Sequence, residues 1–219
     1  MEKLKLVVCI SGTGSNLKAL HKASLDPKFP AKIVLVVSNK PQAPGVVRSQ
    51  KAKLNTIVID EKKYISQSSF EGKLNEVILL AGGELVCLAG FMRLLSGEFC
   101  RQWNNKLINI HPSILPAFKG LNAQEKSLRA GVKFSGCTVH FVREKMDTGP
   151  IIIQAIIPIL QNDTLKSLTE KILEQEHKIF KEAVQLIANK QITIENEKVI
   201  INQYACEPTY LINPSIKTR

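Results

Sequence analysis

Asn109 and His111 are the residues of this sequence whose types and spacing point most directly to chemistry. They lie two positions apart in a segment with the apolar pattern of a strand, so their side chains point to the same face. We expect them at the carboxyl end of that strand, the edge at which open α/β sheets bind ligands. There, an amide N–H and an imidazolium can together stabilise an oxyanion. The alternative is a histidine that only hydrogen-bonds beside the proline-rich turn that follows.

A glycine-rich turn over residues 11–16 (Ser-Gly-Thr-Gly-Ser-Asn) follows the first apolar run. The backbone N–H groups of such a turn, at the start of a helix, form an anion site. The turn does not match a dinucleotide fingerprint, because its third glycine position is Leu17 and no acidic residue follows the second strand. We therefore predict a phosphate monoester as its ligand. The alternative is a tight turn in which Ser15 caps the helix.

The segment 144–150 carries a third candidate group, the carboxylate of Asp147. This residue precedes Thr-Gly-Pro, so it could simply initiate a turn between two strands. It could equally lie beside His111 and favour its charged form. Spacing alone leaves both interpretations open.

The order of apolar runs predicts an α/β fold: a Rossmann-like, doubly wound, mostly parallel sheet with antiparallel additions in the C-terminal half. Predicted strands span residues 3–10, 33–38, 56–60, 85–89 and 106–110, and the helices between them span 17–24, 44–53, 70–81 and 95–103. Two antiparallel strands over 138–143 and 149–157 and a long helix over 164–189 follow. We predict one domain over residues 1–190 and a C-terminal hairpin and tail over 191–219, the hairpin turning about Asn196 and the tail loose after Glu207.

The composition narrows the function classes. The chain has 30 Lys+Arg against 19 Asp+Glu, a net charge of +11, but its basic residues are dispersed and aromatic residues make up only 5%. We therefore expect no nucleic-acid partner, although the charge leaves a nucleotide- or nucleic-acid-binding module open as an alternative. The five cysteines form no Cys-x-x-Cys pair and no Cys/His cluster, so we expect no metal and no disulfide. No apolar run suits a signal peptide or a membrane span, so we expect a cytoplasmic location without a membrane partner.

Five stretches of the sequence, in the same order, resemble the phosphoribosylglycinamide formyltransferases, also called glycinamide ribonucleotide transformylases. They are residues 10–17, residues 88–95, Asn109-Ile110-His111-Pro112-Ser113, residues 136–142 with 146–150, and residues 173–177. The resemblance implies the formyltransferase fold and transfer of a formyl group from 10-formyltetrahydrofolate, as co-substrate, to the amine of 5'-phosphoribosylglycinamide in purine (IMP) biosynthesis. It implies these small molecules as the partners, and a monomer or a homodimer as the assembly.

The same resemblance assigns ribonucleotide binding to the N-terminal half of the chain. Gly14, Ser15 and Asn16 would hold the ribonucleotide. Glu176, from the long helix, would position its glycinamide end.

Folate binding and catalysis are assigned mainly to later segments. Met92, Arg93, Leu94 and Leu95, with the loop from Arg143 to Asp147, would line the folate pocket. By the same resemblance, Asn109 would reach the formyl group and His111 would donate the proton and stabilise the oxyanion. Asp147 would favour the protonated form of His111.

Two positions depart from the family pattern. Gln67 stands where family members often carry an arginine that contacts the folate, so Gln67 is counted among the folate-pocket residues. Ala117 stands where many members have a lysine, and Lys119 is the nearest basic residue. Both departures affect the strength of binding more than the class of reaction.

Two related families use the same formyl donor. Methionyl-tRNA formyltransferases add a C-terminal tRNA-binding domain, for which the residues after 190 are too few. Formyltetrahydrofolate deformylases usually begin with a regulatory domain, whereas this sequence begins at its first predicted strand. The interpretation favoured by the sequence is therefore the ribonucleotide enzyme.

The lack of a predicted ligand cluster has a direct test. Formyl transfer should proceed without added metal and should survive a chelator, because no group of side chains is expected to hold an ion. The measurement is the rate of formyl transfer before and after treatment with EDTA. Complete loss of the rate, restored by zinc or magnesium, would contradict the prediction.

Overall fold

Strands and helices alternate along the chain in the computed structural model, which describes residues 2–202, 211 and 213. The strands are β1 (Leu4–Ile10), β2 (Ala31–Ser38), β3 (Thr56–Val58), β4 (Leu85–Leu88), β5 (Leu107–His111), β6 (Phe134–Phe141), β7 (Ile151–Pro158), β8 (Ile192–Glu195) and β9 (Lys198–Ile201). The helices are α1 (Ser15–Ser24), α2 (Pro44–Lys51), α3 (Gln67–Leu80), α4 (Gly97–Gln102), α5 (Ala123–Arg129) and α6 (Leu165–Ala188), with a short 3-10 helix, η1, over Glu61–Lys63.

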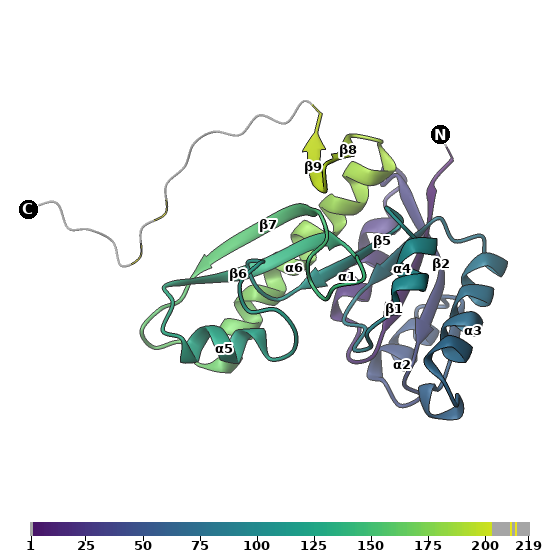
Figure 1. Cartoon of the computed structure of the whole chain (residues 1–219), viewed down its shortest axis with the longest axis horizontal. Coiled ribbons are helices and arrows are strands. Elements are labelled where there is room, and N and C mark those ends of the chain that lie inside the picture. The colour runs from purple at the N-terminus through teal and green to yellow at the C-terminus, as the bar shows by residue number, and fades with distance from the viewer. Residues whose placement is uncertain (1, 203–210, 212, 214–219) are drawn as a thin grey trace, which may run out of the picture.

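A seven-stranded sheet in the order β3-β2-β1-β4-β5-β6-β7 forms the centre of the structure (Figure 1). The first five of these strands pair in parallel, whereas β6 pairs antiparallel with β5 and β7 antiparallel with β6. The predicted doubly wound, mostly parallel sheet with antiparallel additions is therefore confirmed.

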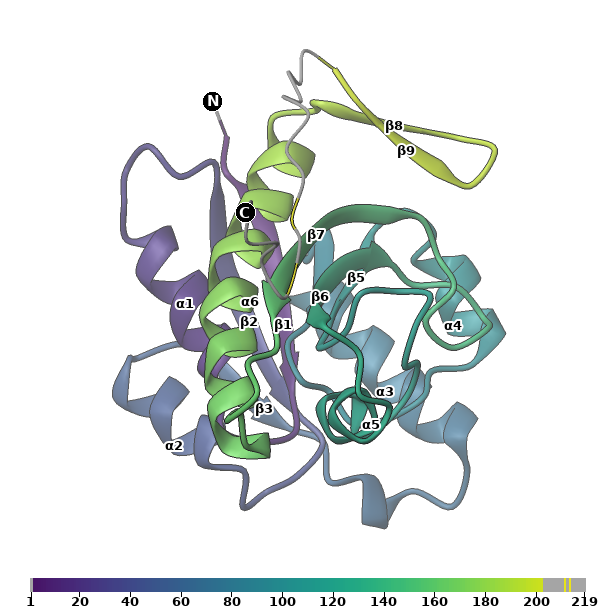
Figure 2. The same ribbon diagram turned by 90° about the vertical axis from the view of Figure 1, so that its left-hand side faces the viewer.

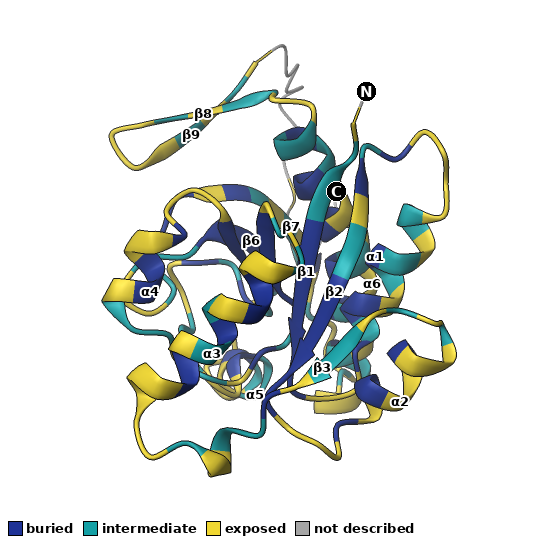
Figure 3. Ribbon diagram, turned by 90° about the vertical axis from the view of Figure 1, so that its right-hand side faces the viewer, coloured by how far each residue is buried: buried dark blue, intermediate teal, exposed yellow. Residues whose placement is uncertain are grey.

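Helices cover both faces of this sheet, which explains why its central strands are apolar throughout. α1 and α6 pack on one face (Figure 2), and α3 and α4 pack on the other. Residues Leu6 to Ile10 of β1 are fully buried, and β1 is buried along most of its length in Figure 3. A strand covered on both sides reads as a continuous apolar run, which is why the sequence predicted it well.

Several boundaries differ from the prediction. β6 begins at Phe134 rather than at residue 138. The prediction placed the start too late because glycine, here Gly136, usually weakens a strand. In the structure Gly136 is required: a Cβ there would lie 1.9 Å from the carbonyl oxygen of Ala155 on β7. α3 begins at Gln67 because Ser66 and Ser69 form a capping box. The short helix α5, entered from Asn122 in a left-handed conformation, was not predicted at all.

The hairpin at the C-terminal end is confirmed. β8 and β9 pair antiparallel as a separate two-stranded sheet, and the turn residues Asn196 and Glu197 both have positive φ, as tight hairpin turns require. The predicted loose tail after Glu207 lies outside the described residues, apart from Leu211 and Asn213. The domain division at residue 190 stays a prediction. Among the described residues no helix combines the length and the hydropathy needed to cross a bilayer.

Gly45 at the start of α2 sets how closely this helix approaches the glycine turn. Its N–H donates to the carbonyl oxygen of Gly12 at 2.9 Å. A Cβ at Gly45 would lie 2.6 Å from Cδ1 of Ile10 and 2.9 Å from the same Gly12 oxygen. A larger residue would therefore push α2 away from the turn.

We expect Gly45→Ala to lower the free energy of unfolding by about 1–3 kcal/mol, the usual cost of forcing an extra group into a packed site. Gly72→Ala is the matched control, because Gly72 is an exposed residue of α3 whose added Cβ would meet nothing within 4 Å. That variant should gain about 0.5–1 kcal/mol from better helix propensity. Urea unfolding of both variants measures the difference, and equal stabilities would contradict the packing argument.

Candidate active site

The carboxyl ends of β1, β2 and β4 are joined by hydrogen bonds at one edge of the sheet. The Ser11 hydroxyl donates to Oδ1 of Asn39 at 2.6 Å and accepts from the Met92 N–H at 2.7 Å. The Ser11 N–H donates to the carbonyl oxygen of Gly90 at 3.0 Å. The glycine turn and the segment 90–95 are therefore held side by side, although Ser11 and Met92 lie 81 positions apart in sequence.

The glycine turn has the geometry of an anion site. Gly14, with φ of 69°, is the residue before α1, and no side chain caps the helix. The first hydrogen bond within α1 runs from the Lys18 N–H to the Gly14 carbonyl oxygen, so the N–H groups of Ser15 and Asn16 are not used inside the helix. The alternative in which Ser15 caps α1 is therefore wrong. Unused N–H groups at a helix start favour an anionic ligand.

A buried pair links this turn to α6. Nδ2 of Asn16 donates to Oε2 of Glu176 at 2.7 Å, across 160 positions of sequence. Both residues are more than nine-tenths buried, and Oδ1 of Asn16 has no hydrogen-bond partner among the described residues. Burial raises the pKa of the Glu176 carboxyl to about 7, and the bond from Asn16 opposes this only in part. Burying this pair therefore costs free energy of folding, and Oδ1 of Asn16 remains an acceptor without a partner among the described residues.

His111 and Asp147 lie together, although 36 positions separate them in the sequence. Nδ1 of His111 is 3.5 Å from Oδ2 of Asp147, and both side chains are buried. The same carboxylate oxygen accepts from the Gly120 N–H at 2.8 Å. Nε2 of His111 lies 3.1 Å from the carbonyl oxygen of Phe118. Because a carboxylate and a carbonyl can only accept, this arrangement satisfies both ring nitrogens only when the imidazole is doubly protonated.

The loop that carries Asp147 folds back over β6 to reach His111. Asp147 has φ of 52°, a left-handed conformation that aspartate tolerates better than most residues. A Cβ at Gly149 would lie 1.8 Å from the carbonyl oxygen of Phe141, so only glycine permits this close return. Of the two interpretations that spacing left open, the structure therefore has the carboxylate beside the histidine.

His140 is a member of this cluster that the sequence analysis did not single out. It stands opposite Asn109 in the antiparallel register of β5 and β6, with 3.3 Å between its Nε2 and Nδ2 of the asparagine. Its Nδ1 lies 2.9 Å from the Phe141 carbonyl oxygen, and its Nε2 lies 3.7 Å from Oδ1 of Asp147. Burial lowers the pKa of His140, which favours the neutral ring. With Nδ1 protonated, Nε2 accepts from Asn109 and so orients the asparagine amide.

The residues predicted for the folate pocket lie near the same edge, but in different environments. The side chains of Met92 and Leu94 are exposed, by 60% and 67%, and Leu95 packs partly against the core. Arg93 pairs with Glu61 at 3.1 Å and stacks over the Phe70 ring, 4.3 Å from its centroid.

Gln67 also contacts this segment. Its Nε2 donates to Oε1 of Glu71 at 2.9 Å and to the Leu94 carbonyl oxygen at 3.2 Å. Gln67 therefore supports the backbone of the predicted pocket, and its amide is used within the protein.

Arg143 is not brought to the histidine cluster. Its guanidinium pairs with Glu197 of the β8–β9 turn at 2.8 Å and donates to Oδ1 of Asn105 at 2.8 Å. Asn105 precedes β5, so the side chain points to the amino-end edge of the sheet. The assignment of Arg143 to the folate pocket stays a prediction that its side-chain contacts do not support.

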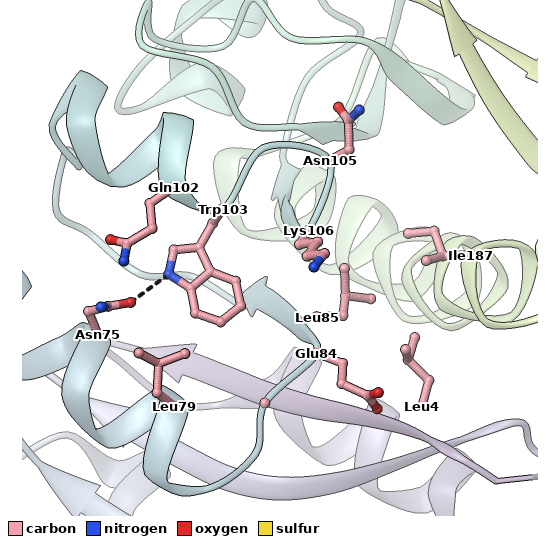
Figure 4. Close-up of a pocket in the computed structure, with 11 residues that line it drawn as sticks. Leu4, Asn75, Leu79, Glu84, Leu85, Gln102, Trp103, Asn105, Lys106 and Ile187 are labelled. Carbon is pink, nitrogen blue, oxygen red and sulfur yellow. Dashed lines mark hydrogen bonds between the residues drawn. The ribbon is translucent and has the colours of Figure 1, made fainter.

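A pocket of about 450 Å³ lies at that amino-end edge (Figure 4). Leu4, Leu85 and Trp103 line it, and the Trp103 indole N–H donates to Oδ1 of Asn75 at 3.0 Å. None of the site residues predicted from the sequence lines this pocket, and all of them are among the described residues. Within residues 2–202, 211 and 213, no three His, Cys, Asp or Glu residues are grouped so as to hold a metal ion.

Comparisons with known proteins show the family of this chain. The family model described as "Formyl transferase" matches residues 4–184. The chain belongs to the formyl transferase family. The phosphoribosylglycinamide formyltransferase of Bacillus subtilis is 41% identical over 174 residues, which are 80% of this chain and 89% of that protein.

Solved structures agree with the sequence comparison. A glycinamide ribonucleotide transformylase from Symbiobacterium toebii superimposes with a TM-score of 0.89 at 41% identity, over 92% of this chain and 95% of that one. The bovine trifunctional purine biosynthetic protein adenosine-3 is 47% identical over 199 residues. The match covers 90% of this chain but only 20% of the bovine protein, so the chain spans about a fifth of that relative's length.

The raised pKa of the buried Glu176 carboxyl predicts that the free energy of unfolding depends on pH. Its pKa is about 7 in the folded protein and near its ordinary value of 4.5 once unfolded. The folded state therefore loses stability as pH rises from about 4.5, and the loss is complete above about 7. We expect Glu176→Gln to stabilise the protein at pH 8, by up to about 3 kcal/mol, with little effect near pH 4.5.

Urea unfolding at several pH values measures this effect. Glu170→Gln is the matched control, because Glu170 is exposed on the same helix. Its stability relative to the parent should not change with pH in this range. A pH-independent effect of Glu176→Gln would mean that the carboxyl is ionised at little expense.

Proposed function

We propose that this chain transfers the formyl group of 10-formyltetrahydrofolate to the amine of 5'-phosphoribosylglycinamide, a step of purine biosynthesis. Membership of the formyl transferase family and the names of the relatives from Bacillus subtilis and Symbiobacterium toebii support this choice. Both small molecules act as substrates, and no metal takes part. We propose a cytoplasmic enzyme that works as a monomer or a homodimer without nucleic-acid partners.

The observation that carries the proposal is the convergence of Asn109, His111 and Asp147. The two loops that close on His111, one directly after β5 and one after β6, present only acceptors to its ring. An imidazolium held in this way, beside an oriented amide, is suited to stabilise negative charge on a carbonyl oxygen. Acyl transfer to an amine develops such a charge.

In the proposed reaction the amine nitrogen attacks the formyl carbon, and the carbonyl oxygen becomes a tetrahedral oxyanion. Collapse of this species breaks the bond between the formyl carbon and N10 of the folate. The proton lost by the attacking amine balances the proton gained by N10, and His111 is placed to carry it. Since Nδ1 faces Asp147, Nε2–H is the donor for the oxyanion and would exchange the Phe118 carbonyl for it.

We propose that the ribonucleotide binds at the glycine turn. Gly14, Ser15 and Asn16 would hold its phosphate through backbone N–H groups. Glu176 would position the glycinamide end, since its carboxylate is held at the turn by Asn16.

We propose that the folate lies beside Met92, Arg93, Leu94 and Leu95 and the loop that ends at Asp147. The exposed apolar side chains of Met92 and Leu94 would pack against its ring system. The Gln67 amide would contribute by supporting Leu94, because it cannot pair with a carboxylate as an arginine would.

The direct experiment mixes the protein with glycinamide ribonucleotide and a 10-formyl folate, and follows both the folate absorbance and the mass of the ribonucleotide. Formylated ribonucleotide and deformylated folate should appear in equal amounts. Release of formate without a formylated product would indicate a deformylase instead. A salt-sensitive shift of RNA, with no transfer, would favour the nucleic-acid-binding alternative.

The His111–Asp147 contact is tested by Asp147→Asn, which keeps the size and the left-handed conformation but removes the charge. We expect kcat to fall on the order of 10²–10⁴-fold with little change in folate binding. His111→Ala should be similarly damaging. Because the two residues act as one unit, the double variant should be far less than multiplicatively worse.

The control is Asp26→Asn, which alters an exposed aspartate at the end of α1 and should leave kcat unchanged. Steady-state kinetics of the four variants decide the matter. If the effects of Asp147→Asn and His111→Ala multiply, the two residues act independently and the proposed role of Asp147 as the partner of His111 is wrong.

A further inference from the structure

A row of polar side chains crosses three strands beneath the loop that follows His111. In the antiparallel register Thr138 of β6 stands opposite His111 of β5, and Gln154 of β7 stands opposite Thr138. Residues directly opposite each other in an antiparallel pair point to the same face of the sheet. His111, Thr138 and Gln154 therefore share one face.

The Thr138 hydroxyl uses all its hydrogen-bonding capacity on this loop and on Gln154. It donates to the Ser113 carbonyl oxygen at 2.7 Å, and it accepts from the Leu115 N–H at 3.1 Å and from Nε2 of Gln154 at 3.0 Å. Nε2 of Gln154 also donates to the Leu115 carbonyl oxygen at 2.9 Å. Thr138 has no exposed surface. The two side chains thus bind both backbone polar groups of Leu115 and fix the base of the loop.

The rest of the loop closes on the catalytic pair. The Ser113 hydroxyl donates to the Ala117 carbonyl oxygen at 2.6 Å, which tightens the turn above the base. The next residue, Phe118, supplies the carbonyl that faces Nε2 of His111, and the Gly120 N–H donates to Asp147. Hydrogen bonds to the backbone of residues 113–120 therefore connect Gln154 with both His111 and Asp147.

We propose that Thr138 and Gln154 are positioning residues for the His111–Asp147 pair, acting through the backbone of residues 113–120. This inference rests on the proposed function for its effect on the rate. Neither side chain is given a contact with the reacting atoms. Their role is to hold the Phe118 carbonyl and the Gly120 N–H where the imidazole and the carboxylate need them.

The charge state of His111 makes this positioning consequential. Asp147 and His140 are the titratable groups beside it, and Lys119 lies close enough to act on His140; of these only Asp147 is an anion. The Phe118 carbonyl is the second acceptor that stabilises the doubly protonated ring. When the base of the loop is released, this acceptor moves and the ring is free to turn. A displacement of about 1 Å in such a group can lower a rate on the order of 10²-fold.

Three variants test the proposal. Thr138→Val replaces the hydroxyl with a methyl group of similar size, Thr138→Ser restores the hydroxyl, and Gln154→Met removes the amide at similar length. We expect Thr138→Val and Gln154→Met to lower kcat on the order of 10–100-fold, with KM for both substrates little changed. Thr138→Ser should recover most of the lost rate. If Thr138→Val does not fold, Gln154→Met alone decides the kinetic comparison.

Thr56→Val is the matched control. The Thr56 hydroxyl also bonds a side chain and a backbone carbonyl, those of Ser49 and Leu54, but it lies on β3 at the far edge of the sheet. Thr56 is only half-buried, but a purely structural loss of a hydrogen-bonded hydroxyl should still appear in this variant as a lower unfolding temperature without a change in kcat. Only Thr138→Val and Gln154→Met should lower kcat.

An NMR measurement separates failure of this inference from failure of the proposed function. Compared at one pH, the ¹⁵N signals of the His111 ring should differ from those of the parent in Thr138→Val and Gln154→Met, but not in Thr56→Val. This result would support the positioning role even if the parent showed no formyl transfer. Unchanged His111 signals, or a Thr138→Ser variant as damaged as Thr138→Val, would overturn it.

Discussion

The structure of the site depends on one requirement: both ring nitrogens of His111 face hydrogen-bond acceptors. Nδ1 faces the Asp147 carboxylate and Nε2 faces the Phe118 carbonyl, and no donor approaches either nitrogen among the described residues. The two acceptors come from loops on either side of β6, so the antiparallel turn of the chain after β5 is what brings them together. A purely parallel continuation would send the chain through a crossover and away from this point. The departure from a regular doubly wound sheet is thus the feature that builds the site.

Two histidines in the same cluster have different hydrogen-bond surroundings. His140 has a backbone carbonyl at one nitrogen and the Asn109 amide at the other, so its neutral form satisfies both, and burial lowers its pKa. His111 has two acceptors and is satisfied only when doubly protonated. The neutral ring of His140 orients the Asn109 amide, and the ring of His111 faces the Asp147 carboxylate. Environment, rather than residue type, separates these roles.

The parts of the fold and the site that sequence could predict are those set by local pattern. Buried parallel strands are apolar on both faces, so the bounds of β1, β2 and β4 were predicted to within two residues. The two-residue spacing of Asn109 and His111 likewise predicted that both side chains lie on one face of β5. Features set by distant contacts were missed or left open. Gly136 looks like a breaker until Ala155 is seen against it, His140 gains its role only from the register of β6 on β5, and Arg143 turns away to reach Glu197. The contact of Asp147 with His111 needed the return of a loop that only Gly149 permits.

At the proposed ribonucleotide end of the site, the contact between Asn16 and Glu176 is unfavourable for folding. Asn16 and Glu176 join the first helix to the last, yet the bond brings a carboxyl into a buried place where ionisation is unfavourable and leaves an amide oxygen without a partner. Buried groups in this condition are among the most expensive in a protein, and apolar side chains of the same size would join the helices more cheaply. Two extensive apolar clusters, one on each face of the sheet, supply the stability that offsets this expense. Folding alone does not favour this polar pair, whereas the ribonucleotide binding proposed above, with a phosphate at the N–H groups of the α1 start, would give it a role.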